Sequence, residues 1–249
     1  MDIIDIRELC HRFPDGTQSL ADISLTINSG DFVLIAGANG SGKTTLLKHF
    51  NGLLRPESGT VRVCGVPVQD DPLAARKNVG MVFQDADSQI VGDTVYDDVC
   101  FGPENLRFER DDIERRVKTA LAAVNLGGSM NKSPHHLSGG EKRRLAIAGV
   151  LAMTPQVMVL DEPFSNLDYP ATATVLQQIQ QLHRGGHTIV VTTHDLEKVI
   201  TLANRLVVMD RGRIVRDGSP ADVVGEIDAY GIRPPCSVLL GQGIQPWLR

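Results

Sequence analysis

The stretch that decides the fold is Phe32-Val-Leu-Ile-Ala36-Gly37-Ala38-Asn39-Gly40-Ser41-Gly42-Lys43-Thr44. Its apolar start predicts a buried strand, and the residues from Lys43 to about Leu53 predict a helix. The segment between them matches GxxxxGK[ST], a pattern that requires this strand-loop-helix context. Glycines let backbone N–H groups approach phosphate oxygens, and a helix start adds the positive end of its dipole. The stretch therefore predicts a phosphate loop, with Lys43 on the β- and γ-phosphates and the Thr44 hydroxyl on Mg²⁺.

A second apolar run, 157–160, is followed directly by Asp161 and Glu162. Asp161 is expected to hold the Mg²⁺ shell, and Glu162 to orient or deprotonate an attacking water. Apolar strands that end in acids also occur in ordinary solvated turns. The phosphate loop upstream is what makes this pair the second half of a nucleotide site.

Strand and helix patterns alternate around these two segments. Further strands are expected at 60–64, 79–83, 188–192 and 206–209, and helices at 171–182 and 196–203. This alternation predicts an α/β fold with a parallel sheet covered by helices. Period-two apolar residues from Ile4 to Ile27, around the turn Pro14-Asp15-Gly16, predict an antiparallel β ribbon, and helical spacing within about 94–150 predicts a helical subdomain.

Composition limits the functions that are open to the chain. It has 249 residues, 42% of them hydrophobic, and 25 Lys+Arg against 30 Asp+Glu for a net charge of −5. These values predict one folded domain with at most a small appendage, and they argue against a nucleic-acid partner. The four cysteines have no short paired spacing and are expected to be core thiols. The N-terminus lacks the basic and apolar pattern of a signal peptide, and no apolar run is long enough to cross a bilayer.

A second helix start with open backbone N–H groups lies at Leu137-Ser138-Gly139-Gly140-Glu141. Ser138 is a suitable N-cap for a helix that runs to about Ala152. An ordinary capped helix would explain the pattern. The chain nevertheless has one phosphate loop and two anion-binding helix starts, which a second chain in the active assembly would also explain.

With these motifs in order, the chain resembles the nucleotide-binding subunits of ABC transporters over about residues 1–225, which implies a P-loop NTPase cassette. The resemblance implies that Leu137–Glu141 is the signature motif, whose Ser138, Gly139 and Gly140 contact ATP held by the opposite protomer of a head-to-tail dimer. It further implies a Walker A loop of Gly37, Ala38, Asn39, Gly40, Ser41, Gly42, Lys43, Thr44 and Thr45, a Walker B pair Asp161 and Glu162, a Q-loop Gln84 that senses Mg²⁺ and water, a D-loop ending at Asp168, a switch His194, and an adenine-stacking Phe13.

The segment from Val79 through Gln84 and Gln89 to Leu106 is similar to the ATPases of energy-coupling factor (ECF) importers, the cobalt and nickel type included. That resemblance implies a second ATP-binding subunit, identical or paralogous, a transmembrane coupling protein, a substrate-capture membrane protein, and a location on the cytoplasmic face of the membrane. The substrate would be a vitamin or a transition-metal ion. Gly92-Asp93 departs from the family pattern, in which a small apolar residue precedes Pro. The tail 226–249 is short, and dimer contacts from it are a hypothesis.

Other functions stay open at this point. The chain is compatible with another class of ABC importer or an exporter, with a soluble ABC ATPase of DNA repair or translation, and with a catalytically silent regulatory module. The short stretch between the phosphate loop and Ser138 leaves no room for a long coiled coil, and a single Walker A loop argues against a tandem translation factor. The complete set of Lys43, Asp161, Glu162 and His194 argues against a silent module.

Overall fold

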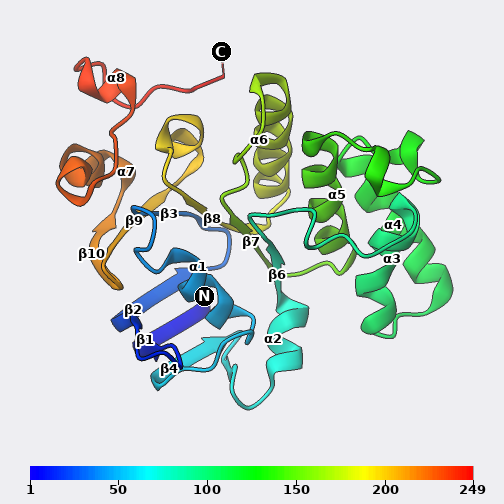
Figure 1. Ribbon diagram of the computed structural model, residues 1–249, viewed down its shortest axis with the longest axis horizontal. Helices are drawn as coiled ribbons and strands as arrows, with labels where there is room; N and C mark the ends of the chain where they lie inside the picture. Colours follow the sequence, from blue (N-terminus) through cyan, green and yellow to red (C-terminus); the bar gives the residue numbers. More distant parts are fainter. Residues whose placement is uncertain (249) are drawn as a thin grey trace.

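A computed structural model describes residues 1–248, and its centre is a mixed sheet of six strands in the order β10-β9-β3-β8-β7-β6 (Figure 1). All neighbouring pairs are parallel except β9 and β10. The strands are β3 (Phe32–Ala36), β6 (Val79–Val82), β7 (Val157–Asp161), β8 (Thr188–Thr193), β9 (Arg205–Asp210) and β10 (Arg213–Gly218). The expected α/β fold with a parallel-sheet core is confirmed.

The register of this sheet brings three functional segments to one edge. Ala36 pairs with Thr193, and Asp161 pairs with Thr192. The phosphate loop, Glu162 and His194 each follow the carboxyl end of one of these strands. The carboxyl edge of a parallel sheet is where α/β proteins bind their ligands, so the topology alone gathers the predicted site.

A second, antiparallel sheet lies below the first (Figure 1). Its strands are β1 (Asp2–Arg12), β2 (Gln18–Asn28), β4 (Ser58–Val63) and the short β5 (Val66–Pro67). Helix α1 (Lys43–Phe50) lies between the two sheets, and Leu46, Leu47 and Phe50 are fully buried in the core that both sheets share. The helix that begins at the phosphate loop is thereby held on both sides.

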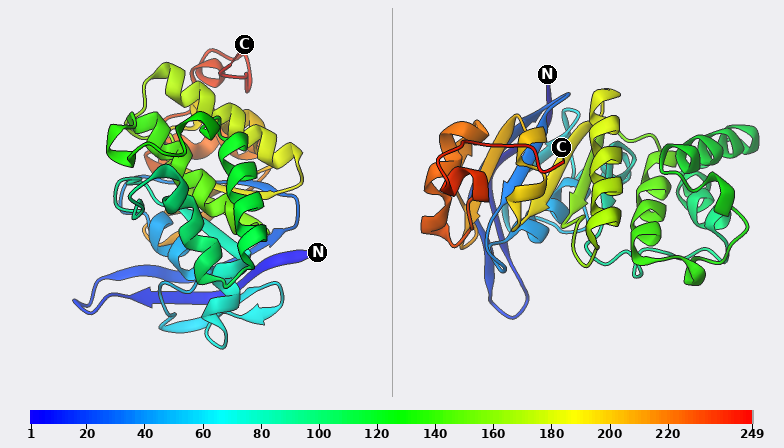
Figure 2. Two further views of the ribbon diagram at one scale, coloured as in Figure 1. Left: turned by 90° about the vertical axis from the view of Figure 1, so that its right-hand side faces the viewer. Right: turned by 90° about the horizontal axis from the view of Figure 1, so that it is seen from above.

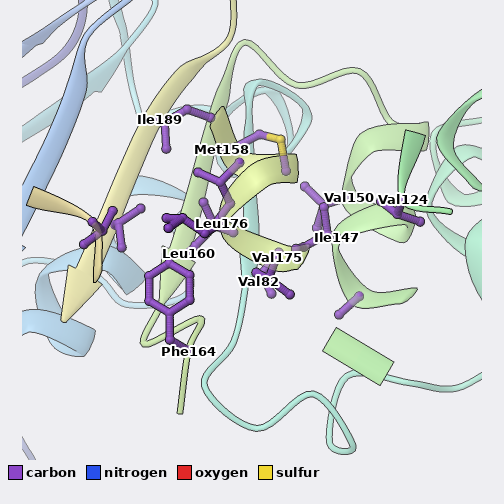
Figure 3. Packing of buried hydrophobic residues seen from close by; sticks show 14 of the residues in the cluster. Val82, Val124, Ile147, Val150, Met158, Leu160, Phe164, Val175, Leu176 and Ile189 are labelled. Atoms are coloured by element: carbon purple, nitrogen blue, oxygen red, sulfur yellow. The ribbon is translucent and has the colours of Figure 1, made fainter. Parts of the chain in front are cut away.

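The third part is helical and stands to the side of the main sheet, as the view from above in Figure 2 shows. It contains α3 (Val95–Asn105), α4 (Arg110–Ala123) and α5 (Gly139–Ala152), and α6 (Tyr169–Arg184) lies between it and the sheet. Figure 3 shows Ile147 and Val150 of α5 beside Val175 of α6 and Val82 of β6. One continuous apolar core therefore joins the helical part to the sheet.

Short elements complete the described chain. They are α2 (Pro72–Asn78), α7 (Pro220–Val223) and α8 (Cys236–Leu239), with 3-10 turns at Gly127–Ser129, Pro134–His136, Leu196–Lys198, Ile200–Leu202 and Val224–Tyr230. None of the helices in this part of the chain combines the length and apolar character that crossing a membrane requires.

Three expectations are corrected by the structure. Helix α1 ends at Phe50 instead of about Leu53, because Gly52 takes a left-handed conformation with φ of +69° and turns the chain. Residues 196–203 form two 3-10 turns, not one helix, since Asn204 is fastened to Phe32 by its backbone N–H and by its side chain. Of the cysteines, Cys100 is buried, but Cys236 is exposed and is no core thiol.

Candidate nucleotide site

A cavity of about 440 Å³ opens at the carboxyl edge of the main sheet. It gathers predicted residues from the β ribbon, the phosphate loop, the segment after β6 and the ends of β7 and β8. Its lining consists of Phe13, Thr17, Gln18, Ser19, Asn39, Gly40, Ser41, Gly42, Lys43, Thr44, Thr45, Gln84, Glu162 and His194. Of these, Thr17, Gln18 and Ser19 were not anticipated. Ser19 donates a hydrogen bond from Oγ to Oγ1 of Thr45 at 2.9 Å and so ties β2 to the first turn of α1.

Lys43 is buried to 7% exposure at the floor of this cavity. Its Nζ donates to the carbonyl oxygens of Gly37 at 2.7 Å and of Ala38 at 3.1 Å. Burial lowers the pKa of this ammonium below its usual value, and the nearby charges of Glu162 and Asp161 oppose that shift. The side chain is therefore a desolvated cation aimed at the loop, as a group that recognises phosphate requires.

Two glycines of the loop are required by its geometry. A Cβ on Gly37 would meet the Ser41 side chain and would lie 2.6 Å from the carbonyl oxygen of Met209. Gly42 has a φ of +102°, and a Cβ there would lie 2.8 Å from the carbonyl oxygen of Ser19. Larger residues would open the loop, so the glycines serve both the turn and the close approach that an anion needs.

Each carboxylate oxygen of Asp161 accepts a hydrogen bond from a threonine hydroxyl group. Thr44 donates from Oγ1 to Oδ2 at 2.7 Å, and Thr192 donates from Oγ1 to Oδ1 at 2.5 Å. Thr44 and Asp161 are two of the three predicted Mg²⁺ ligands, with Gln84 as the third, and the structure brings these two into direct contact. Hydroxyl and carboxylate oxygens are the hard donors that Mg²⁺ prefers.

Glu162 and His194 form the second close pair of the site. His194 Nδ1 lies 2.9 Å from Glu162 Oε1, with the glutamate side chain 9% exposed and the histidine side chain 58% exposed. Glu162 takes a left-handed φ of +46°, and its backbone N–H donates to the Oγ1 and the carbonyl oxygen of Thr192. A strained backbone that is fixed by neighbouring groups is common where a side chain must be aimed.

Gln84 begins a loop whose shape depends on a residue outside the predicted site. Gln89 accepts from the Phe83 backbone N–H through Oε1 at 3.0 Å and donates from Nε2 to the Met81 carbonyl at 3.1 Å. The side-chain amide of Gln89 thus makes the kind of hydrogen bonds that a neighbouring strand would make at the edge of β6. The sequence gives no signal for this role of Gln89, because no local pattern shows an amide that pairs with a strand edge.

The departure at Gly92 has a steric reason. Asp98, which is 8% exposed, accepts through Oδ1 from the backbone N–H groups of Val91 at 2.8 Å and of Gly92 at 3.1 Å. A Cβ on Gly92 would collide with the backbone of Asp98 in α3. The loop after Gln84 therefore packs directly against the first turn of α3, where the helical part begins.

The predicted signature residues lie at the start of α5, and none of them lines the cavity within residues 1–248. Ser138 is the N-cap, as expected: Glu141 N–H donates to its Oγ, and its own N–H donates to Glu141 Oε2 at 2.8 Å. Gly139 has open space around it, whereas a Cβ on Gly140 would lie 2.7 Å from the Cβ of Ala171 in α6. Gly140 therefore also has a packing role that the sequence did not reveal.

The remaining predicted residues occupy the ends of neighbouring elements. Asp168 is the N-cap of α6 and accepts from the Ala171 backbone N–H at 2.9 Å. Phe13 precedes the β1–β2 turn, is half-buried, and has its ring edge-on to His11 at 4.9 Å between centroids. Asp168 lies outside the cavity lining, while Phe13 is part of it.

A phosphate loop, a carboxylate strand and a histidine at one sheet edge, with a helical part that carries a capped serine, define the ABC class of P-loop ATPases. Residues 20–165 match the family described as ABC transporter. The chain belongs to the ABC transporter ATP-binding family and is an ATPase.

Three similar proteins cover most of the chain. A putative ABC transporter ATP-binding protein of Halobacterium salinarum is 50% identical over 94% of this chain and 100% of its own length. The energy-coupling factor transporter ATP-binding protein EcfA of Methanocaldococcus jannaschii is 44% identical over 92% and 83%. The structure of CbiO1 from Clostridium perfringens, described as part of the ABC transporter complex CbiONQ, superposes with a TM-score of 0.82 at 36% identity and covers 92% of both chains. The ECF-type resemblance is thereby confirmed.

Proposed function

We propose that this chain is the ATP-binding subunit of an energy-coupling factor importer, in which MgATP hydrolysis at a dimer interface drives uptake of a vitamin or a transition-metal ion. EcfA of M. jannaschii and CbiO1 of C. perfringens, both similar over more than nine-tenths of this chain, support the importer class. The chain would act at the cytoplasmic face of the membrane, beside a transmembrane coupling protein and a substrate-capture protein.

The residues at the cavity fit MgATP. The Ser41 Oγ is buried and has no hydrogen-bond partner among residues 1–248, as expected for a group that awaits a phosphate oxygen. Lys43 would bind the phosphates with the loop N–H groups, and Phe13 would stack on the adenine. Thr44, Asp161 and Gln84 would hold Mg²⁺, which neutralises charge that develops on the transferred phosphoryl group.

Glu162 would be the residue that acts on water. Glu162 lines the cavity beside His194, and its side chain is 9% exposed, so it is shielded from bulk solvent. In the proposed reaction Glu162 orients the attacking water and accepts its proton, and His194 positions that carboxylate and reaches the γ-phosphate. General-base assistance of this kind is worth about 10²- to 10⁴-fold in rate.

The observation that supports a dimer is that two groups of residues predicted to bind one ATP lie apart within this chain. Lys43 and Glu162 line the cavity, whereas Ser138, Gly139 and Gly140 lie at the start of α5 outside it. A second copy, or a paralogous chain, placed head to tail would bring its α5 start onto this cavity with Asp168 beside it. ATP favours that closed state through its contacts with both chains, and hydrolysis releases it.

Two further assignments belong to this proposal. Residues 1–225 would form the cassette, with the helical subdomain at about 94–150 facing the membrane partner. The tail 226–249 would add dimer contacts. In the single chain, Trp247 packs on Tyr169 of α6 with ring centroids 4.9 Å apart.

The dimer is tested in a Glu162→Gln background, which should retain ATP. Analytical ultracentrifugation with MgATP should show a dimer for Glu162→Gln and a monomer for Glu162→Gln with Ser138→Arg, because the added side chain would occupy the shared site. Ser219 is a matched control, because its side chain is likewise the N-cap of a helix, in this case the short α7. Glu162→Gln with Ser219→Arg should still dimerise. A dimer that persists with Ser138→Arg would overturn the shared site.

The importer class is tested by affinity purification of the tagged chain from solubilised membranes of its own cell. We expect a transmembrane coupling protein and a small substrate-capture membrane protein to co-purify in defined ratio. Recovery of an exporter or of a permease that uses an external binding protein would assign the ATPase to that class instead. Recovery in the soluble fraction without any membrane partner would favour a non-transport ABC ATPase.

A further inference from the structure

Arg143 in α5 connects the helical part of the molecule to the Q-loop. Its side chain is buried to 4% exposure. Nη1 donates to the carbonyl oxygen of Phe83 and Nη2 to that of Gln84, both at 2.6 Å. The two carbonyl groups belong to consecutive residues at the end of β6, so the planar fork of the guanidinium holds the main chain from which the Gln84 side chain projects.

Burying this guanidinium is costly. Burial lowers the pKa of Arg143, and the charges of Asp85 and Asp161 oppose that shift. Its Nε has no acceptor among the described residues. An apolar side chain would fill the same space between α5 and the sheet at lower desolvation cost. The two strong hydrogen bonds to the Q-loop are the gain that offsets this cost.

The contact adds a buried polar link between two parts that share an apolar core. Phe83 is held on both sides, since Gln89 binds its N–H and Arg143 binds its carbonyl oxygen. Arg143 lies in the same helix as the capping box of Ser138 and Glu141, within one helical turn of Glu141. The neighbouring ion pair of Lys142 with Asp87, at 2.5 Å, is exposed on the aspartate side and adds little.

We propose that Arg143 is a positioning residue that fixes the backbone of Gln84 and thereby sets the side chain of Gln84 toward the reacting centre. This inference rests on the role proposed above for Gln84. It makes α5 and the Q-loop one rigid unit, so a displacement of either is transmitted to the other. Misplacement of a group by about 1 Å can cost about 10²-fold in rate, which sets the scale of the effect.

Arg144 provides a matched control. It is the next residue of α5, and its Nη1 also donates to main-chain carbonyls, those of Val124 at 3.0 Å and Asn125 at 3.4 Å. Both acceptors belong to the helical part itself. Loss of this arginine therefore removes the same chemistry without touching the Q-loop.

The test is a double-mutant cycle for ATP hydrolysis by the complete transporter. We expect Arg143→Gln to lower kcat about ten- to a hundredfold, with ATP-analogue affinity changed by less than about threefold, because Lys43 and Phe13 are untouched. Arg144→Gln should leave kcat within about threefold. Arg143→Lys, which can reach one carbonyl, should recover part of the loss.

The cycle with Gln84→Ala separates positioning from general structure. If Arg143 acts through Gln84, the double variant should be no slower than Gln84→Ala alone. Additive losses, or an unchanged kcat in Arg143→Gln, would overturn the inference. If Gln84→Ala itself keeps full activity, the proposed role of Gln84 fails instead. Should Arg143→Gln not fold, Arg143→Lys takes its place in the same cycle.

Discussion

His194 Nδ1 lies 2.9 Å from Oε1 of Glu162, and the two residues follow the carboxyl ends of adjacent parallel strands. The glutamate side chain is 9% exposed and the histidine side chain 58% exposed. The pair therefore has a buried member that is fixed by the sheet and an exposed member that is free to respond to what enters the cavity. This arrangement is typical of a base and the group that orients it.

Glu162→Gln is expected to reduce ATP turnover by about 10²- to 10⁴-fold, because the amide cannot accept a proton from water. The amide keeps the size of the carboxylate, so ATP affinity should stay near that of the unaltered chain. Phosphate release in single-turnover conditions measures the first quantity, and equilibrium binding of ATP measures the second. Normal turnover in this variant would remove Glu162 from the proposed mechanism.

Phe13→Ala is expected to weaken ATP binding by about 5- to 150-fold, since stacking of a base on an aromatic ring contributes about 1 to 3 kcal/mol. Phe13→Tyr keeps the ring and should bind ATP as tightly as the unaltered chain. Calorimetric titration of both variants gives the affinities. A lower unfolding midpoint in Phe13→Ala without any loss of affinity would instead make Phe13 a packing residue.

Gly140→Ala and Gly139→Ala should change stability in opposite directions. A Cβ on Gly140 would lie 2.7 Å from that of Ala171, whereas Gly139 has open space. Overpacking between α5 and α6 should cost about 1 to 3 kcal/mol in Gly140→Ala. Alanine is the better helix former, so Gly139→Ala should gain up to about 1 kcal/mol. Urea unfolding compares the two, and equal shifts would refute the packing role of Gly140.

His49 should make the protein less stable in mild acid. Burial and the nearby His11 lower its pKa from 6.5 to about 4 in the folded chain. Between these values the unfolded chain binds a proton that the folded chain does not, so the free energy of unfolding falls as the pH falls. From pH 7 to pH 5 this loss is about 2 kcal/mol.

His49→Leu should remove that part of the pH dependence, since leucine binds no proton in either state. The measurement is the difference between urea-unfolding free energies at pH 7 and pH 5, taken for the unaltered chain and the variant. The difference between pH 7 and pH 5 should be about 2 kcal/mol larger for the unaltered chain than for His49→Leu. Equal differences would show that His49 binds its proton alike in both states.

Much of the fold was predictable because its signals are local. The runs around Val33, Val159 and Val190 are apolar at consecutive positions, whereas a half-buried strand would alternate apolar and polar residues. Each run forms a strand that is buried on both faces. The missed elements lack such signals. Strand β10 is a polar, half-exposed edge strand, and the apolar spacing of Leu196, Val199 and Ile200 suits an α-helix and consecutive 3-10 turns equally well.

The site residues were predictable where one short motif carries the chemistry. Lys43 and Thr44 were predicted from the phosphate-loop motif in its strand-loop-helix context, and Asp161 from its place at the end of an apolar run. The structure brings them to one sheet edge; their roles stay predictions. The roles of Gln89 and Arg143 could not be predicted, because each side chain acts on main-chain carbonyl or N–H groups, which for Arg143 lie 59 and 60 residues away. Such contacts leave no residue-type signature on the partner.

The hydrogen bonds from Lys43 to Gly37 and Ala38 have a consequence for kinetics. An ammonium has three donors, and two of them bind carbonyl groups of the loop itself. The ordering entropy of the loop is therefore incurred during folding and not during capture of a ligand. Association with ATP should then proceed in a single concentration-dependent phase set by diffusion into the cavity, with no slower loop-closing step inside the monomer.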